Sequence, residues 1–285
     1  MAVSRNELHD RRHLDIWGQD TALLVMTYSK MEKYLPAIRQ NLDLFWPNRP
    51  EMLIATDGAA AGEDVFVGTS ASFLALLSEA LDELRLRFPK VQYVFVLLED
   101  LCPLAPVDDA RLTEAFSALK AAGGQYMLNH WPTKRHRPWK DENWDLSASL
   151  SQGRTRLMPM SRGYETYNSL VACIWSVTYL EQLISVKLAR GIGDPWGFER
   201  YLDGAQEQHY VLENAWPTFA NGFMIAGRVN ARCVTAPAFP ASPLMSQLRR
   251  EYCGADSFVR ACLKRFNDRM ARSWRKRFRP KNADK

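Results

Sequence analysis

The first half of the chain alternates between short apolar runs and segments with the periodicity of an amphipathic helix. The apolar runs, which we predict to be buried strands, lie at residues 21–28, 51–58, 91–98 and 125–129. The segments between them carry apolar side chains at spacings of three and four: Leu35, Ile38, Leu42 and Phe45; Phe73, Leu77, Leu81, Leu84 and Phe88; and Leu112, Ala115, Phe116 and Leu119. This alternation predicts an α/β fold, with a Rossmann-like, mostly parallel central sheet and helices on both faces.

The second half is less regular. We predict strands at residues 155–160, 167–175 and 220–229, a helix at residues 179–188, and a helix or turn at residues 193–200. Residues 130–145 are polar, basic and rich in tryptophan, and we predict a long loop there. This loop either binds an anionic molecule, such as the acceptor of a transfer reaction, or is simply solvated. Its cations are Lys134, Arg135, Arg137 and Lys140.

Polar residues follow three of the predicted strands. In a parallel sheet, ligands bind beyond the carboxyl ends of the strands. We therefore predict a donor-binding site from Thr27, Tyr28, Asp57, Glu99 and Asp100. Asp100 is the candidate metal ligand, because a carboxylate there can hold Mn²⁺ or Mg²⁺ against a diphosphate leaving group. The alternatives are that Asp100 caps a turn and that Asp57 belongs to an Asp-Gly turn.

A second candidate site lies in the segment GDPWGFE, after the predicted helix. An indole can stack on a sugar face while a carboxylate accepts a hydroxyl proton as general base. We predict Trp175 and Trp196 as acceptor-binding residues, and Glu199 and Asp194 as catalytic candidates. Asp194 also fits a helix N-cap, with Pro195 at the first helical position. A capping carboxylate is a weaker base, so Glu199 is the preferred candidate.

These two segments together resemble a family of bacterial GT-A-type glycosyltransferases of surface polysaccharide synthesis. The resemblance is carried by LLEDLCPLAPVDD and NSLVACIWSVTYLEQLISVKLARGIGDPWGFE, in that order, and extends over residues 21–229. Val171 departs from the family, which has Gln at that position. The resemblance implies a nucleotide-sugar donor, a saccharide or lipid-linked acceptor, a divalent cation at Asp100 and an acid near Trp196 that faces the acceptor.

The charge distribution separates a body, residues 1–255, from a basic amphipathic C-terminal tail, residues 256–285. The tail holds eleven Lys or Arg and three Asp, a net charge of +8, which leaves −3 for the body. Its apolar stripe recurs every four residues, at Phe258, Cys262, Phe266, Met270 and Trp274. A cationic helix of this kind fits an anionic membrane surface, packing on the body, or a nucleic acid. We do not expect nucleic acid as the partner.

Bulk features complete the expectation. The five cysteines form no Cys-x-x-Cys pair, and no apolar run reaches the length of about 20 residues that spans a membrane. We therefore expect a cytoplasmic transferase with reduced thiols, peripheral on the inner face of a membrane if the tail binds lipid. The alternatives are a non-catalytic nucleotide- or sugar-binding protein of the same fold and an RNA-associated protein that uses the tail. His209 is a weaker candidate for a metal or acceptor contact.

Overall fold

The computed structural model describes the greater part of the body. The described residues are 16–70, 72–101, 103, 106–128, 147–160, 168–170, 172–200, 209–213, 224–225, 228–229 and 243–252. Their strands are β1 (Thr21–Met26), β2 (Glu51–Thr56), β3 (Val65–Val67), β4 (Tyr93–Leu98), β5 (Tyr126–Leu128), β6 (Leu150–Gln152), β7 (Thr155–Pro159), β8 (Cys173–Ser176), β9 (His209–Leu212), β10 (Met224–Ile225) and β11 (Arg228–Val229). Their helices are η1 (Ser29–Tyr34), α1 (Leu35–Phe45), α2 (Phe73–Arg87), η2 (Glu99–Leu101), α3 (Asp109–Ala121), α5 (Val177–Ala189), α6 (Pro195–Arg200) and α8 (Pro243–Tyr252).

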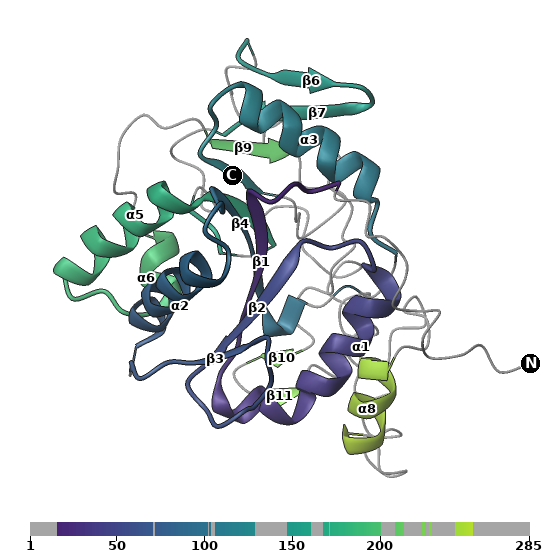
Figure 1. The fold of residues 1–285 in the computed structure, drawn as a ribbon, viewed down its shortest axis with the longest axis vertical. Helices are drawn as coiled ribbons and strands as arrows, with labels where there is room; N and C mark the ends of the chain where they lie inside the picture. The colour runs from purple at the N-terminus through teal and green to yellow at the C-terminus, as the bar shows by residue number, and fades with distance from the viewer. Residues whose placement is uncertain are drawn as a thin grey trace, which may run out of the picture.

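A nine-stranded mixed sheet forms the centre of this α/β fold (Figure 1). Its strand order is β3-β2-β1-β4-β8-β5-β9-β7-β6. The first four strands of this order are parallel, as predicted for β1, β2 and β4, and β5 is parallel to β9. The expectation of a mostly parallel sheet is wrong for the rest, because β8 runs antiparallel to both β4 and β5, and β7 antiparallel to β6 and β9.

Helices pack on both faces of the sheet, as the alternation of β1 side chains shows. Leu23 and Val25 join one apolar cluster, which contains residues of α1, α3 and α8. Ala22, Leu24 and Met26 join the opposite cluster, which contains residues of α2, α5 and α6. Because successive strand residues point to opposite faces, a strand with every residue buried must be covered on both sides.

Most helix and strand predictions in the first half are confirmed, and two of these helices begin with a side-chain cap. The Ser72 Oγ accepts a hydrogen bond from Ala75 N at 3.3 Å, and the Asp108 Oδ1 accepts one from Arg111 N at 3.1 Å. Gly123, with φ of 65°, follows the end of α3. The short strands β3, β6 and β9 were not predicted, because three or four residues are too few to establish a period.

The predicted core strand at residues 220–229 is wrong within the described residues. Met224–Ile225 and Arg228–Val229 instead pair with each other as a separate two-stranded antiparallel sheet. The intervening Ala226 and Gly227 lie outside the described residues, as do the whole basic loop at residues 130–145 and the whole tail. Among the described helices, none combines the length and apolar character needed to cross a membrane.

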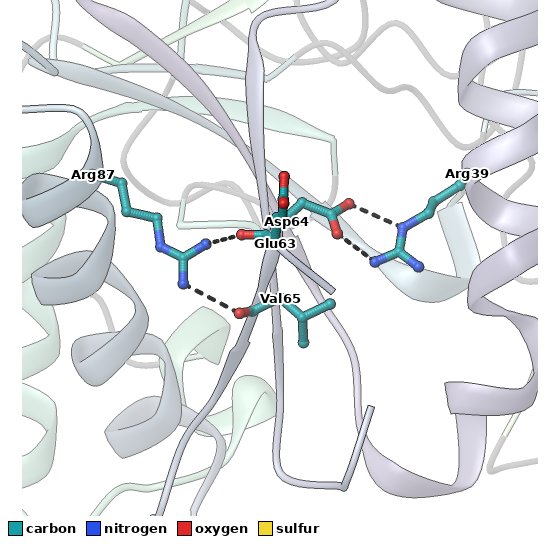
Figure 2. A network of polar contacts seen from close by, with 5 residues as sticks. All are labelled: Arg39, Glu63, Asp64, Val65 and Arg87. Carbon is teal, nitrogen blue, oxygen red and sulfur yellow. Dashed lines mark hydrogen bonds and ion pairs between the residues drawn. The ribbon is translucent and has the colours of Figure 1, made fainter. Parts of the chain in front are cut away.

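Two arginines clamp the chain just before the edge strand β3 (Figure 2). Arg39 of α1 binds both carboxylate oxygens of Asp64, through Nε at 2.9 Å and Nη2 at 2.6 Å. Arg87 of α2 donates to the carbonyl of Glu63 and, at 3.2 Å, to that of Val65. Since α1 and α2 cover opposite faces, the clamp fixes the far end of the loop between β2 and β3 from both sides.

We expect Arg39→Met to lower the free energy of unfolding by about 1 kcal/mol, because it removes a two-pronged ion pair that is only about one third exposed. Arg49→Met is the matched control, since the Asp43 partner of Arg49 is 63% exposed and solvent weakens that pair. Urea unfolding of both variants provides the measurement. Equal losses in the two variants would show that the clamp adds nothing beyond a surface ion pair.

Candidate functional site

The carboxyl ends of the three central parallel strands lie side by side. Met26 of β1 pairs with Ala55 of β2 and with Leu98 of β4. The next residues in the chain are Thr27, Thr56 and Glu99. Three polar residues therefore stand at the carboxyl ends of adjacent strands, at one edge of the sheet. The strand order also reverses at β1, since β2 lies on one side and β4 on the other. Such a switch point is where open α/β sheets bind ligands.

Asp57 joins the segments that follow β1 and β2. Its Oδ1 accepts a hydrogen bond from Ser29 N at 2.6 Å. The Thr27 N–H donates to the Ala55 carbonyl at 2.9 Å, while the Thr27 hydroxyl is buried without a partner among the described residues. The structure therefore brings Thr27 and Asp57, two of the predicted donor-binding residues, to the same edge.

Glu32 of η1 supports the Asp57 loop and was missed by the sequence analysis. Its Oε1 accepts hydrogen bonds from Thr56 Oγ1 at 3.1 Å and from Ala60 N at 2.9 Å. Burial acts to raise the pKa of Glu32, but hydrogen bonds from the backbone of Ala60 and Ala59 and from Thr56 outweigh it and hold the pKa below the ordinary value. A Cβ atom at Gly58 would lie 1.9 Å from this Oε1, so only glycine lets the loop approach Glu32 so closely.

The other predicted donor residues lie at or next to the strand ends. Tyr28 packs against the core, and its carbonyl accepts a hydrogen bond from Met31 N at 2.8 Å. Glu99 is partly buried and begins η2 directly after β4. Asp100 lies in the same turn, but its side chain is outside the described residues. Among the described side chains, no group of three or more His, Cys, Asp or Glu could hold a metal ion.

Glu199 lies in α6, and one of its carboxylate oxygens is held in place. Oε1 accepts hydrogen bonds from Ser169 Oγ at 2.9 Å and from Leu170 N at 3.2 Å. Oε2 has no such bond within the described residues. Burial raises the pKa of Glu199, against the opposing effect of the Leu170 and Ser169 hydrogen bonds. A fixed carboxylate with one oxygen left and a raised pKa is a stronger base than an ordinary glutamate and is suited to accept a proton.

Glu199 lies at the same edge as the strand ends described above. Cys173 of β8 pairs with Val96 of β4, and the two strands are antiparallel. The segment before Cys173, which includes Ser169 and Leu170, therefore runs past the carboxyl end of β4. Ala172 in this segment has φ of 45°, an unusual value for a residue with a Cβ atom, and it turns the chain into β8.

The two other candidate residues near α6 differ in role: Asp194 caps the helix, and Trp196 exposes its indole ring. Asp194 Oδ1 accepts a hydrogen bond from Gly197 N at 2.9 Å, so Asp194 caps α6, as its alternative interpretation predicted. Trp196 is 67% exposed, and it precedes Glu199 by three residues on the same helix. Residues three apart lie close on a helix surface, which leaves an accessible indole near the carboxylate.

The predicted acceptor contact of Trp175 requires correction, because its indole is fully buried. Its Nε1 donates to Cys173 Sγ at 3.0 Å, and its ring centroid lies 4.2 Å from that of Tyr126. Phe198, His209 and Tyr179 also surround it. Trp175 is therefore a core residue, and in this structure it offers no face to a sugar.

His209 is also a core residue. It is 2% exposed, and its Nε2 lies 3.1 Å from the Tyr179 hydroxyl. The weaker hypothesis of a metal or acceptor contact therefore loses its basis. The basic loop residues Lys134, Arg135, Arg137 and Lys140 lie outside the described residues.

We compared the chain with models of known protein families and with curated proteins. No family model matches it. The curated proteins give no match either.

Proposed function

We propose that the chain is a glycosyltransferase with a GT-A-like fold, which transfers a sugar from a nucleotide-sugar donor to a saccharide or lipid-linked acceptor in surface polysaccharide synthesis. The observation that carries the proposal is the environment of the Glu199 carboxylate. This carboxylate is partly buried, has a raised pKa, and is fixed by Ser169 and Leu170 at the edge where the parallel strands end.

Glu199 is the general base of the proposed reaction. Oε2 accepts the proton of an acceptor hydroxyl as the hydroxyl oxygen attacks the anomeric carbon of the donor sugar. A new glycosidic C–O bond forms while the bond from the anomeric carbon to the diphosphate oxygen breaks. The nucleoside diphosphate leaves with the bonding electron pair, and the anomeric configuration inverts. Trp196 supplies a stacking surface for the acceptor.

The donor half of the proposal rests on the edge formed by β1, β2 and β4. The strand order β3-β2-β1-β4 matches the first four positions of a doubly wound sheet, which include its switch point. Thr27 and Glu99 lie on either side of the switch point, and Asp57 is locked beside them through Ser29. A nucleoside diphosphate placed there would lie at the same edge as Glu199.

A divalent cation stays a prediction, with Asp100 as its ligand. The described carboxylates by themselves do not form a metal centre, and Asp57 already accepts a hydrogen bond from Ser29 N.

We expect nucleoside diphosphates to raise the midpoint of thermal unfolding, and manganese to increase the shift. Asp100→Asn should weaken manganese-dependent nucleotide binding by about tenfold or more, the scale of losing a charged ligand. Asp43→Asn is the control, because Asp43 is an exposed carboxylate on α1, away from the strand ends. Equal binding by Asp100→Asn and the unchanged protein would remove Asp100 from the site.

Turnover is tested separately by hydrolysis of nucleotide-sugars in the absence of acceptor. Release of free sugar and nucleoside diphosphate supports a transferase. Nucleotide-sugar binding without either product under any metal condition would instead favour the non-catalytic binding protein.

A further inference from the structure

Two asparagines in the described residues are completely buried, and they differ in one respect. Asn41 of α1 has both ends of its amide satisfied: Nδ2 donates to the Pro103 carbonyl at 2.9 Å, and Oδ1 accepts from Leu244 N at 3.2 Å. Asn168 lies just before Ser169, and neither its Nδ2 nor its Oδ1 has a partner in the part of the chain that is described. Both residues carry the same buried carboxamide, but only that of Asn41 has hydrogen-bond partners among the described residues.

An amide buried without partners is unfavourable, because folding removes its bonds to water and returns none. Buried polar groups in proteins are nearly always bonded, so an exception requires an explanation. An ordered water could supply the bonds, or a ligand could.

The surroundings of Asn168 favour a ligand. The next residue, Ser169, donates its hydroxyl to Glu199 Oε1 at 2.9 Å, so Asn168 is one residue from the support of the proposed base. Tyr126 also lies near this segment: burial, with Cys173 and Glu199 nearby, raises the Tyr126 pKa well above its ordinary value, against the opposing effect of a hydrogen bond with the Ser169 backbone. Bonding capacity is therefore left over on the Asn168 amide and on Glu199 Oε2.

We propose that Asn168 binds two adjacent hydroxyl groups of the acceptor sugar and so positions one of them at Glu199. A carboxamide matches such a diol, because its N–H₂ donates to one oxygen while its carbonyl accepts from the neighbouring hydroxyl. The inference rests on the proposed function, in which Glu199 takes the proton of an acceptor hydroxyl. Because the amide is covered in this structure, binding includes a local rearrangement that uncovers it.

Asn168→Leu tests this directly, with Asn41→Leu as the matched control. Leucine removes the unsatisfied polar atoms at residue 168 while keeping a similar volume, so Asn168→Leu should unfold at an equal or higher temperature. Asn41→Leu leaves the Pro103 carbonyl and Leu244 N–H unsatisfied, so its unfolding midpoint should fall by about 2–4 °C or more. Binding is measured by saturation-transfer NMR with the methyl glycosides of glucose, galactose and mannose.

The expected result is that at least one glycoside binds the unchanged protein and that Asn168→Leu weakens this binding about tenfold or more. The affinity for nucleoside diphosphate should stay the same. The proposal is overturned if no glycoside binds, if Asn168→Leu binds as the unchanged protein does, or if it loses thermal stability as Asn41→Leu does. Weakened binding of nucleotide-sugars alone would also overturn it, because the contact would then belong to the donor.

This readout is independent of turnover. Glycoside binding that depends on Asn168, in a chain that neither transfers nor hydrolyses sugar, would refute the proposed function and keep the sugar contact. Transfer activity together with unchanged glycoside binding in Asn168→Leu would support the proposed function and refute the sugar contact of Asn168.

Discussion

Glu199→Gln should keep nucleotide binding and lower the rate of sugar transfer by about a hundredfold or more, the usual scale for removal of a general base. Glutamine keeps the oxygen that accepts from Ser169 and Leu170 but cannot take a proton. The measurement is kcat with saturating donor and acceptor, together with nucleotide affinity by calorimetry. Transfer within a fewfold of the normal rate, or a product with retained anomeric configuration, would refute the assignment.

Asp194→Asn is the matched control for this substitution. Asp194 lies at the start of the same helix, but its Oδ1 accepts from Gly197 N as the cap of α6, and asparagine caps about as well. We expect transfer within a fewfold of normal. A loss comparable to that of Glu199→Gln would move the base from Glu199 to Asp194.

The pH dependence gives a second check on Glu199. Transfer requires its ionised form, so the rate should rise with pH around a pKa above the ordinary range of a glutamate. The folded state holds the Glu199 proton more tightly than the unfolded state does, so this residue makes stability fall as pH rises between the unfolded and folded pKa values. Glu199→Gln should remove that decrease and be at least as stable at neutral pH.

Trp175→Ala and Trp196→Ala should have opposite effects, although the sequence analysis gave both residues the same role. Trp175 is fully buried against Tyr126 and four other neighbours on three strands and two helices, so its truncation should cost about 3–5 kcal/mol of unfolding free energy. Trp196 is 67% exposed, so its truncation should change stability by about 0.5 kcal/mol or less.

Acceptor binding should instead depend on Trp196 and not on Trp175. Trp196→Ala should raise the acceptor KM about threefold to tenfold, the scale of one lost aromatic contact, with kcat and nucleotide affinity little changed. Urea unfolding and initial rates over a range of acceptor concentrations provide the measurements. A stable Trp175→Ala variant with impaired acceptor use would restore the sugar-binding role of Trp175, and an unchanged acceptor KM in Trp196→Ala would remove that residue from the site.

The sequence by itself determined the local elements in the first half of the chain. Apolar runs of six or more residues and helical spacings of three and four depend on near neighbours, so periodicity is enough to find these strands and helices. The alternation of these elements also predicted that β1, β2 and β4 would be parallel and that Thr27 and Asp57 would meet at one edge.

Only the tertiary structure decided the rest, because it depends on which distant segments pair. Strand β8 inserts between β4 and β5 and pairs antiparallel with both, and no local pattern specifies a strand's neighbours. The same insertion buries Trp175 and carries Ser169 to Glu199. An apolar aromatic residue near a carboxylate has the same sequence signature in a core and in a sugar site, and burial, which is a property of the packed chain, separates Trp175 from Trp196.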